Sequence, residues 1–301
     1  MRRFSAIALS LITGLAPAAL SGPARAGDFE DCVSVDATVA MTGCTAMIAR
    51  DVLSGRDLAG VYYNRGTALM RLDRTADALA DFDRAIEIDP DSSIFYYNRA
   101  SAERDLGRDE RALADYTRVI ELDPTYVKAH YNIGNIHRAR GDIDQAIAAF
   151  TSAIEESPRY LQAYKNRGRA FADRGDFDTA IADLDTAIGL GPGMADLFAE
   201  RGEIRTAAGQ PDRAIADFDH ALELDSGYAG ALLGRAAAHR ALGAADSALA
   251  DYDRAVELGG AAASALIRDE LARAGIALAP DADYAGTIRP ALVGYLGQSR
   301  R

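Results

Sequence analysis

The sequence of 301 residues contains no tryptophan, two cysteines and four histidines. Zinc and iron–sulfur centres need clusters of Cys and His ligands, so these counts exclude the usual ligand sets for both kinds of site, and we expect no cofactor. Lys and Arg number 33 against 45 Asp and Glu, which gives a formal net charge of −12. An excess of negative charge repels nucleic acid and anionic membranes, so we expect neither as a partner.

Apolar residues, in contrast, make up 49% of the chain, which is ample for a folded core. The length allows two ordinary domains or one elongated array of repeats. No serine nucleophile, glycine-rich phosphate loop or pair of acidic residues stands in a context that would give it chemistry. The composition therefore favours a binding scaffold over an enzyme.

Residues 1–26 have the features of a secretory signal peptide. Two arginines precede an uncharged apolar stretch at 6–20, and Ala24 and Ala26 provide the small residues that signal peptidase reads. The apolar stretch is shorter than the roughly 20 residues that a membrane span needs. We predict cleavage before Gly27, a mature net charge of −15 after loss of three arginines, and a periplasmic or secreted protein.

Export bears on how Cys32 and Cys44 are interpreted. A pair of cysteines outside the cytosol normally oxidises, and this pair lacks the Cys-x-x-Cys spacing of redox-active sites. We predict a disulfide, which would stabilise the fold by about 3 kcal/mol in the chain-entropy model. It would fasten an N-terminal capping segment at 27–58, in which residues 36–53 have helical spacing.

A period of 34 residues organises the middle of the chain. Small residues recur at this interval at Gly66, Ala100, Gly134, Gly168, Gly202 and Ala236, and alanines at Ala78, Ala112, Ala146, Ala180, Ala214 and Ala248. Six repeats fit without a gap into 59–262, at 59–92, 93–126, 127–160, 161–194, 195–228 and 229–262. Each repeat has helical spacing on both sides of a break, which is a glycine at 107, 141, 175, 209 and 243.

This pattern resembles the tetratricopeptide repeat family, whose units share an aromatic residue, a small residue four positions later, an alanine at the start of the second helix and a closing proline. The resemblance covers 204 of the 301 residues. It implies an all-α fold, a right-handed superhelix of helix-turn-helix units with capping helices, in which each unit touches its neighbours. It also implies a protein-interaction scaffold whose inner wall is formed by the first helix of each unit.

Comparison among the repeats predicts salt bridges between the two helices of a unit. An arginine before the small residue and an aspartate sixteen positions later occur together in five repeats, and the third repeat has Ile133 and Ala149 instead. The five pairs are Arg65 with Asp81, Arg99 with Asp115, Arg167 with Asp183, Arg201 with Asp217, and Arg235 with Asp251. Because a guanidinium suits two parallel bonds to a carboxylate, we expect these pairs to be structural.

The family resemblance also places a binding wall on the first helices. Four asparagines in successive repeats are similar to the asparagine ladder of the O-GlcNAc transferase repeat arm, where side-chain amides hold an extended peptide; a solvated or capping role is the alternative. The side chains that we expect to bind are Asn64, Asn98, Asn132, Asn166, Tyr63, Tyr97, Tyr131, Asn135, Arg104, Lys128, Arg138, Lys165 and Arg169.

Charge on this predicted wall is positive, although the protein is acidic. Seven basic residues, which include Arg71 and Arg240, oppose Asp105, Asp173, Glu200 and Glu203. We therefore expect an acidic segment or a free C-terminus of a partner protein to bind there. His130 and His137 lie seven apart on one helix but occupy aromatic positions of the repeat, so we predict packing and not metal binding.

The C-terminal segment 263–301 is predicted to contain a capping helix followed by a short tail. In that helix Leu266, Ile267, Leu271 and Ala274 are expected to face inward. The segment also weakly resembles peptidoglycan-binding helical modules, against which a simple two-helix cap is the alternative. Two functions remain open: a peptide- or protein-binding scaffold in the bacterial envelope, or an envelope module that binds peptidoglycan or another glycan and uses the repeats as a spacer.

Overall fold

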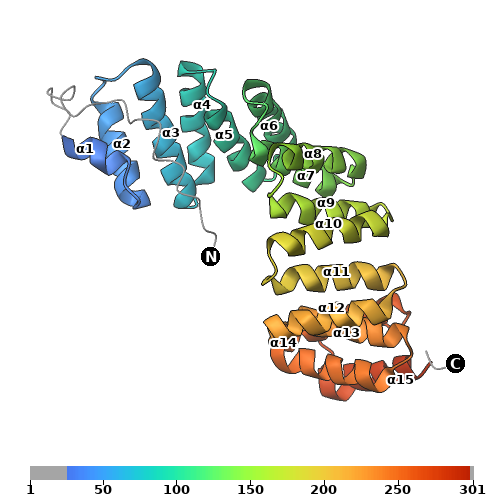
Figure 1. Ribbon diagram of the computed structural model, residues 1–301. Helices are drawn as coiled ribbons and strands as arrows, with labels where there is room; N and C mark the ends of the chain where they lie inside the picture. Colours follow the sequence, from blue (N-terminus) through green and yellow to red (C-terminus); the bar gives the residue numbers. More distant parts are fainter. Residues whose placement is uncertain (1–25, 299–301) are drawn as a thin grey trace. The chain divides into compact units, whose positions relative to one another are not determined.

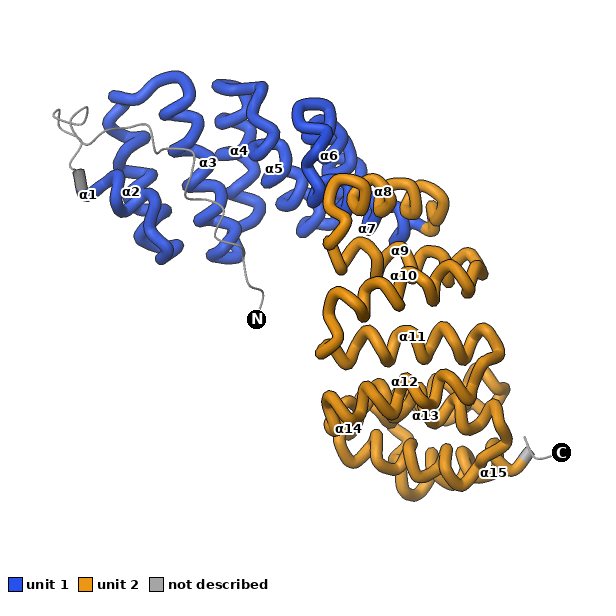
Figure 2. The backbone as a smooth tube through the Cα atoms, viewed as in Figure 1, with its two compact units in different colours: residues 1–140 blue, residues 141–301 orange. Residues whose placement is uncertain are grey.

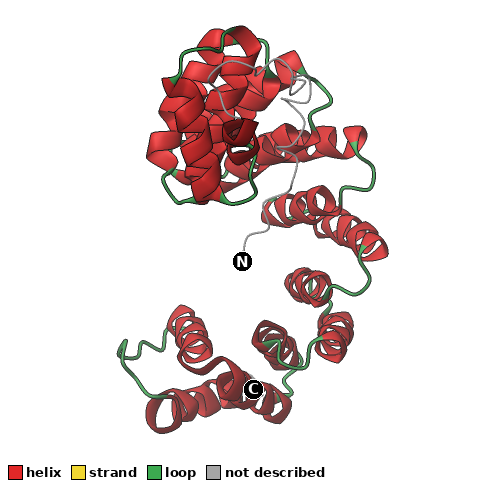
Figure 3. Ribbon diagram, turned by 90° about the vertical axis from the view of Figure 1, so that its left-hand side faces the viewer, coloured by secondary structure: helices red, strands yellow, loops and turns green. Residues whose placement is uncertain are grey.

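The computed structural model describes residues 26–298, and all regular elements in that range are helices (Figures 1 and 3). The predicted signal peptide lies outside the described residues except for Ala26. None of the helices in 26–298 combines the length and the apolar content of a membrane span.

The helices follow the predicted repeats in pairs. The six repeats contain α3 (Gly55–Arg71) and α4 (Thr75–Ile88), α5 (Ser93–Asp105) and α6 (Asp109–Leu122), α7 (Val127–Arg140) and α8 (Ile143–Glu156), α9 (Leu161–Asp173) and α10 (Phe177–Leu190), α11 (Ala195–Ala207) and α12 (Pro211–Leu224), and α13 (Ala229–Ala241) and α14 (Ala245–Arg273). The fold is the predicted all-α solenoid.

The chain forms two compact units (Figure 2). Unit 1 is Met1–Arg140 and unit 2 is Gly141–Arg301. The division falls at the turn of the third repeat, which is the repeat that lacks the Arg and Asp of the other five.

The turn inside most repeats depends on a residue with positive φ. The five predicted glycines all adopt it, for example Gly107 with φ 73°. In the first repeat Asp73 takes this place with φ 58°. Aspartate tolerates this left-handed region better than most residues, which explains why the first repeat can lack the glycine.

The recurring small residue lets the two helices of a repeat approach each other. A Cβ atom on Gly66 of α3 would lie 2.7 Å from the ring of Phe82 in α4, and that ring is fully buried. In repeat five, Gly202 stands in the same relation to Phe218, at 2.9 Å. In these repeats an aromatic ring packs on the backbone of the first helix, and in repeat four Leu184 takes the place of the ring beside Gly168.

At the N-terminal end, α1 (Ala26–Cys32) packs against α2 (Ala37–Ala49), and the predicted disulfide joins Cys32 to Cys44. Asp36 caps α2 by accepting hydrogen bonds from the backbone N–H groups of residues 38 and 39. Gly43 permits the close contact, because a Cβ there would lie 2.6 Å from the backbone nitrogen of Cys32.

At the C-terminal end, α14 continues past the sixth repeat. It is interrupted at Gly260, which has φ 54°, and then runs to Arg273 as the predicted capping helix. Ile267 and Leu271 are buried as predicted, but the prediction was wrong for Leu266 and Ala274, which are exposed. Ala263 is buried instead, so the inward residues recur every four positions from 263.

The predicted short tail contains further packed structure. A single π-helical turn at Tyr284–Ile288 leads into α15 (Arg289–Gln298). Ile288, Leu292 and Leu296 are buried in one cluster with Ile267 and Leu271 of α14. The arrangement corresponds to the two-helix cap that was the alternative interpretation of the sequence.

Candidate functional site

The structure confirms the five predicted salt bridges within repeats. In each, Nε and Nη2 of the arginine donate to the two carboxylate oxygens of the aspartate, at distances between 2.6 and 3.1 Å. The aspartates are buried, whereas the arginine side chains remain partly exposed. The hydrogen bonds that Arg99 donates to Asp115 are the main cause that raises the pKa of Arg99, which keeps that pair ionised.

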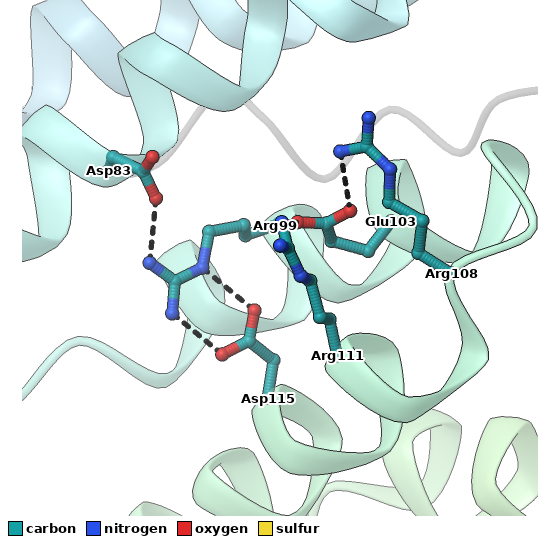
Figure 4. Close-up of polar contacts among 6 residues, drawn as sticks. All are labelled: Asp83, Arg99, Glu103, Arg108, Arg111 and Asp115. Carbon is teal, nitrogen blue, oxygen red and sulfur yellow. Dashed lines mark hydrogen bonds and ion pairs between the residues drawn. The ribbon is translucent and has the colours of Figure 1, made fainter.

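A second set of contacts was not foreseen from the sequence. From the second repeat onward, Nη1 of these arginines donates to a residue of the preceding repeat, as Figure 4 shows for Arg99 between Asp115 and Asp83. Arg201 and Arg235 make the equivalent bonds to Asp185 and Asp219, both at 2.5 Å. An acceptor sixteen residues before each arginine is the signal in the sequence that could have revealed them.

Two further contacts accompany these salt bridges: some of the arginines pack on an aromatic ring of their own helix, and the last repeat has a partner arginine in α15. Arg99 lies over the ring of Tyr96 at 5.5 Å from its centroid, and Arg201 over Phe198 at 5.6 Å. At the last repeat, Asp253 accepts two hydrogen bonds from Arg289 of α15, at 2.8 and 2.9 Å. Arg289 thereby takes the role that the arginine of a seventh repeat would have.

Glu103 is a buried carboxylate that sequence comparison did not single out. Its side chain lies between Arg108 and Arg111 in unit 1 (Figure 4), with nitrogen–oxygen distances of 3.1 and 3.5 Å. Both arginines belong to the turn and second helix of the same repeat. The cluster therefore stabilises the helical hairpin of repeat two.

The asparagine ladder differs from its prediction. The side chains of Asn64 and Asn132 are buried, and those of Asn98 and Asn166 are half-buried. In unit 1 the amide nitrogen of Asn98 donates to Tyr63 Oη at 3.4 Å, and that of Asn132 donates to Tyr97 Oη at 3.3 Å. Each of these amides therefore joins two successive repeats, and the predicted peptide-binding ladder is wrong for the buried Asn64 and Asn132.

The predicted tyrosines differ in a similar way. Tyr63 is buried against the rings of Phe82 and Phe95, and its burial raises its pKa to about 12. Tyr97 is half-buried and packs on Tyr126 at a centroid distance of 4.9 Å. Tyr63 is therefore a core residue, and Tyr97 is only partly accessible to solvent.

Unit 1 retains a basic face, which we define as Tyr97, Arg104, Lys128 and Asn132 of α5 and α7. Arg104 donates to the amide oxygen of Asn132 at 3.0 Å and lies 3.4 Å from Asp105. Lys128 is half-buried and makes no ion pair within the described residues. Both cations therefore keep capacity to bind an external anionic group.

In unit 2 the predicted basic residues are neutralised. Lys165 of α9 pairs with Asp196 and lies 3.7 Å from Glu200, and Arg169 also pairs with Glu200 of α11. Glu200 is buried, and the burial raises its pKa despite these two cations. Lys165 and Arg169 were predicted to attract an acidic partner, but the structure assigns their charge to bonds between repeats four and five.

The other predicted residues are less exposed than a free surface would require. Tyr131, Asn135 and Arg138 of α7 are half-buried, and each has an interaction partner, as does Asn166 of α9. Arg71 donates to the backbone oxygen of Val35, and Arg240 lies 3.1 Å from Glu270. His130 is half-buried, and its Nε2 lies 2.9 Å from the backbone oxygen of Pro124.

These stacked hairpins and the bonds between them define an α-solenoid built from a tandem repeat. The sequence model of the tetratricopeptide repeat matches residues 63–127, 131–195 and 200–265, and the chain therefore belongs to the tetratricopeptide repeat family. No curated protein matches the sequence.

Solved structures show the same fold at low sequence identity. A tetratricopeptide repeat protein from Parabacteroides merdae is 18% identical with a TM-score of 0.60, and the match covers 90% of this chain and 96% of that one. PilW, a widely conserved type IV pilus biogenesis factor, is 22% identical with a TM-score of 0.59, covering 66% and 93%. YrrB, described as having an unusual peptide-binding site, is 24% identical with a TM-score of 0.51, covering 59% and 91%.

Proposed function

We propose that the protein is a non-enzymatic interaction scaffold of the bacterial envelope that binds an extended, acidic segment of a partner protein. The segment would lie along the first helices of unit 1, on the basic face. The proposal rests on the exposure and pairing of Arg104 and Lys128. Both side chains are partly exposed, and within the described residues neither has a full acidic partner, although the net charge of the protein is −12.

The chemistry of the basic face suits a peptide backbone as well as acidic side chains. Arg104 and Lys128 would bind carboxylates, and the half-buried ring of Tyr97 offers an apolar edge between them. Asn132 positions Arg104 by accepting its hydrogen bond and is itself held by Tyr97. The amides therefore orient the cation, a role that differs from the direct peptide contact expected from the sequence.

An envelope location is supported by the signal-like residues 1–26 and by the disulfide, since disulfides persist in oxidising compartments. YrrB, whose description names a peptide-binding site, and PilW, a pilus biogenesis factor, agree with a role in protein binding, although both share only the fold with this chain.

Site-specific photocrosslinking in the native compartment tests the proposal. A photoreactive residue at position 128 should capture acidic segments of one or a few proteins, and the variant Arg104→Glu should reduce that capture. The matched control is a photoreactive residue at Thr117, which is exposed on the second helix α6.

Equal capture from positions 117 and 128, or capture from 128 that does not favour acidic segments, would contradict the proposal. Sedimentation with purified peptidoglycan is the companion measurement. Retention there that persists in Arg104→Glu would support the glycan-binding alternative and overturn the scaffold proposal.

A further inference from the structure

Unit 2 contains a pocket that the bonds between repeats do not explain. It has a volume of about 320 Å³, and its walls come from α11, α13 and the part of α14 that follows Gly260. This volume lies near the lower limit of small-molecule sites in proteins. The pocket is therefore of a size to hold one small molecule or one side chain.

Part of the pocket wall is glycine backbone of α13. Gly230 and Gly234 are one helical turn apart and both line it. Gly234 occupies the position that asparagine takes in the first four repeats, and a Cβ there would lie 2.4 Å from the buried ring of Phe218. Glycine is therefore required at position 234 for packing against Phe218, and the helix backbone at 230 and 234 faces the pocket.

The apolar part of the pocket comes from Leu233, Leu266 and Ile267. Leu266 is 55% exposed, although the neighbouring residues of the capping helix at 263, 267 and 271 are buried. An exposed leucine beside a pocket offers an apolar contact to a bound molecule.

The charged part consists of two acids and two bases. Arg240 and Glu270 neutralise each other at 3.1 Å, and Glu270 also accepts hydrogen bonds from Tyr252 Oη at 2.8 and 2.9 Å. Glu203 and Arg273 also line the pocket, and within residues 26–298 neither of them belongs to an ion pair. One carboxylate and one guanidinium therefore remain for a ligand.

We propose that this pocket binds a free, bulky apolar α-amino acid in its zwitterionic form. The aliphatic or aromatic side chain would contact Leu233, Leu266 and Ile267, the ammonium group would bind Glu203, and the carboxylate would bind Arg273. A ligand with only a negative charge would be repelled by Glu203, and a ligand with only a positive charge would be repelled by Arg273. A ligand with both charges therefore fits best.

The surroundings of Glu203 agree with an ammonium partner. Its carboxylate is exposed at the pocket, yet the surrounding walls reduce its solvation and raise its pKa, and the nearby Glu200 adds to this effect. An ammonium group would replace lost solvation with a charge-assisted hydrogen bond. The site lies within unit 2, and it does not depend on the function proposed for unit 1.

Calorimetric titration of the mature full chain with L-leucine and L-phenylalanine tests the inference. Both should bind, and N-acetyl-L-leucine and L-leucinamide, which each lack one charge, should bind about tenfold or more weakly. Glu203→Gln and Arg273→Gln should weaken L-leucine binding by a similar factor. Glu223→Gln and Arg213→Gln, which change exposed residues of α12 outside the pocket, should leave it within about twofold.

The apolar contact has its own pair of variants. Leu266→Ser should weaken L-leucine binding several-fold, whereas Leu224→Ser, at an exposed leucine of α12, should not. Circular dichroism should show that all variants remain folded, since each change is at an exposed position.

Three results would overturn the inference. The first is the absence of binding by either amino acid. The second is equal binding by N-acetyl-L-leucine, which would remove the role of Glu203 and indicate the C-terminal residue of a polypeptide as the ligand. The third is unchanged binding in Glu203→Gln and Arg273→Gln.

Discussion

The first helices of the two units follow the same repeat but distribute charge differently. In unit 1, Arg104 is bound to a neutral amide and has one exposed acidic neighbour, Asp105 at 3.4 Å, and Lys128 has no ion pair within the described residues. In unit 2, Lys165 and Arg169 are paired with Asp196 and Glu200. The two surfaces carry similar basic residues, yet only unit 1 keeps its positive charge available. A count of charges along a repeat array therefore does not identify a binding surface until their pairing is known.

The largest expected effect is a loss of stability when an Arg–Asp pair of unit 2 is broken. Asp217 is 3% exposed and accepts bonds from both Arg201 and Arg205, so Asp217→Ala would leave Arg205 without a carboxylate partner and Arg201 with Asp185 alone. We expect a loss of about 3–5 kcal/mol in the free energy of unfolding. Urea denaturation followed by circular dichroism measures it, and hydrogen exchange should place the loss in α11 and α12.

A loss below about 1 kcal/mol would show that this Arg–Asp pair contributes little to the stability of the fold. The double-mutant cycle of Arg99→Ala and Asp115→Ala gives the corresponding coupling energy in unit 1. The absence of coupling there would contradict the structural role of the pair.

Removal of the disulfide should act on unit 1 alone. Cys32 and Cys44 are separated by 12 positions, and the double variant Cys32→Ser and Cys44→Ser should destabilise the N-terminal hairpin by about 2–3 kcal/mol. Hydrogen exchange should become faster in α1 and α2, and α12 should be unaffected. Faster exchange throughout unit 2 would contradict the division of the chain into two units.

Two glycines offer a test with opposite signs in the two units. Gly66→Ala in unit 1 would place a Cβ 2.7 Å from the Phe82 ring and should destabilise by about 1–3 kcal/mol. Gly189→Ala in α10 of unit 2 has nothing within 4 Å and should stabilise by about 0.5–1 kcal/mol through helix propensity. Thermal unfolding measures both, and the same sign for the two variants would contradict the packing described for Gly66.

The smallest effect is expected at the C-terminal cap. Hydrogen bonds from Arg289 lower the pKa of Asp253 below its usual 3.8, so this pair stabilises the folded state above that pH, and the contribution is lost as the pH falls through the lowered pKa. Arg289→Ala should therefore reduce the stability of unit 2 slightly at pH 7, and less at pH 2–3. A loss of the same size at both pH values would show that the contact is not ionic.

The fold and the arginine pairs within repeats were predictable because both depend on a fixed period. The hydrogen bond of Arg99 to Asp83 follows the same period, but it joins two repeats. The sequence pattern was interpreted only for pairs within one repeat, so this bond was missed. Leu266 was assigned to the inward face because it adjoins Ile267 in an apolar stretch, whereas the buried residues of this helix recur every four positions at 263, 267 and 271. The period also cannot predict the pairing of Lys165 with Asp196, since it joins residues that differ from their counterparts in other repeats.

The central claim is that positive charge is available on the basic face of unit 1. Fluorescence anisotropy of a labelled glutamate-rich peptide at low salt tests it most directly, with Arg104→Gln/Lys128→Gln compared with Arg84→Gln/Arg118→Gln. The latter pair removes the same charge from second helices of the same unit, where both arginines are bound to glutamates three positions later. We predict that the first double variant weakens binding about tenfold or more and that the second changes it by less than about twofold. An equal loss in both double variants, or no loss in the first, would contradict the claim.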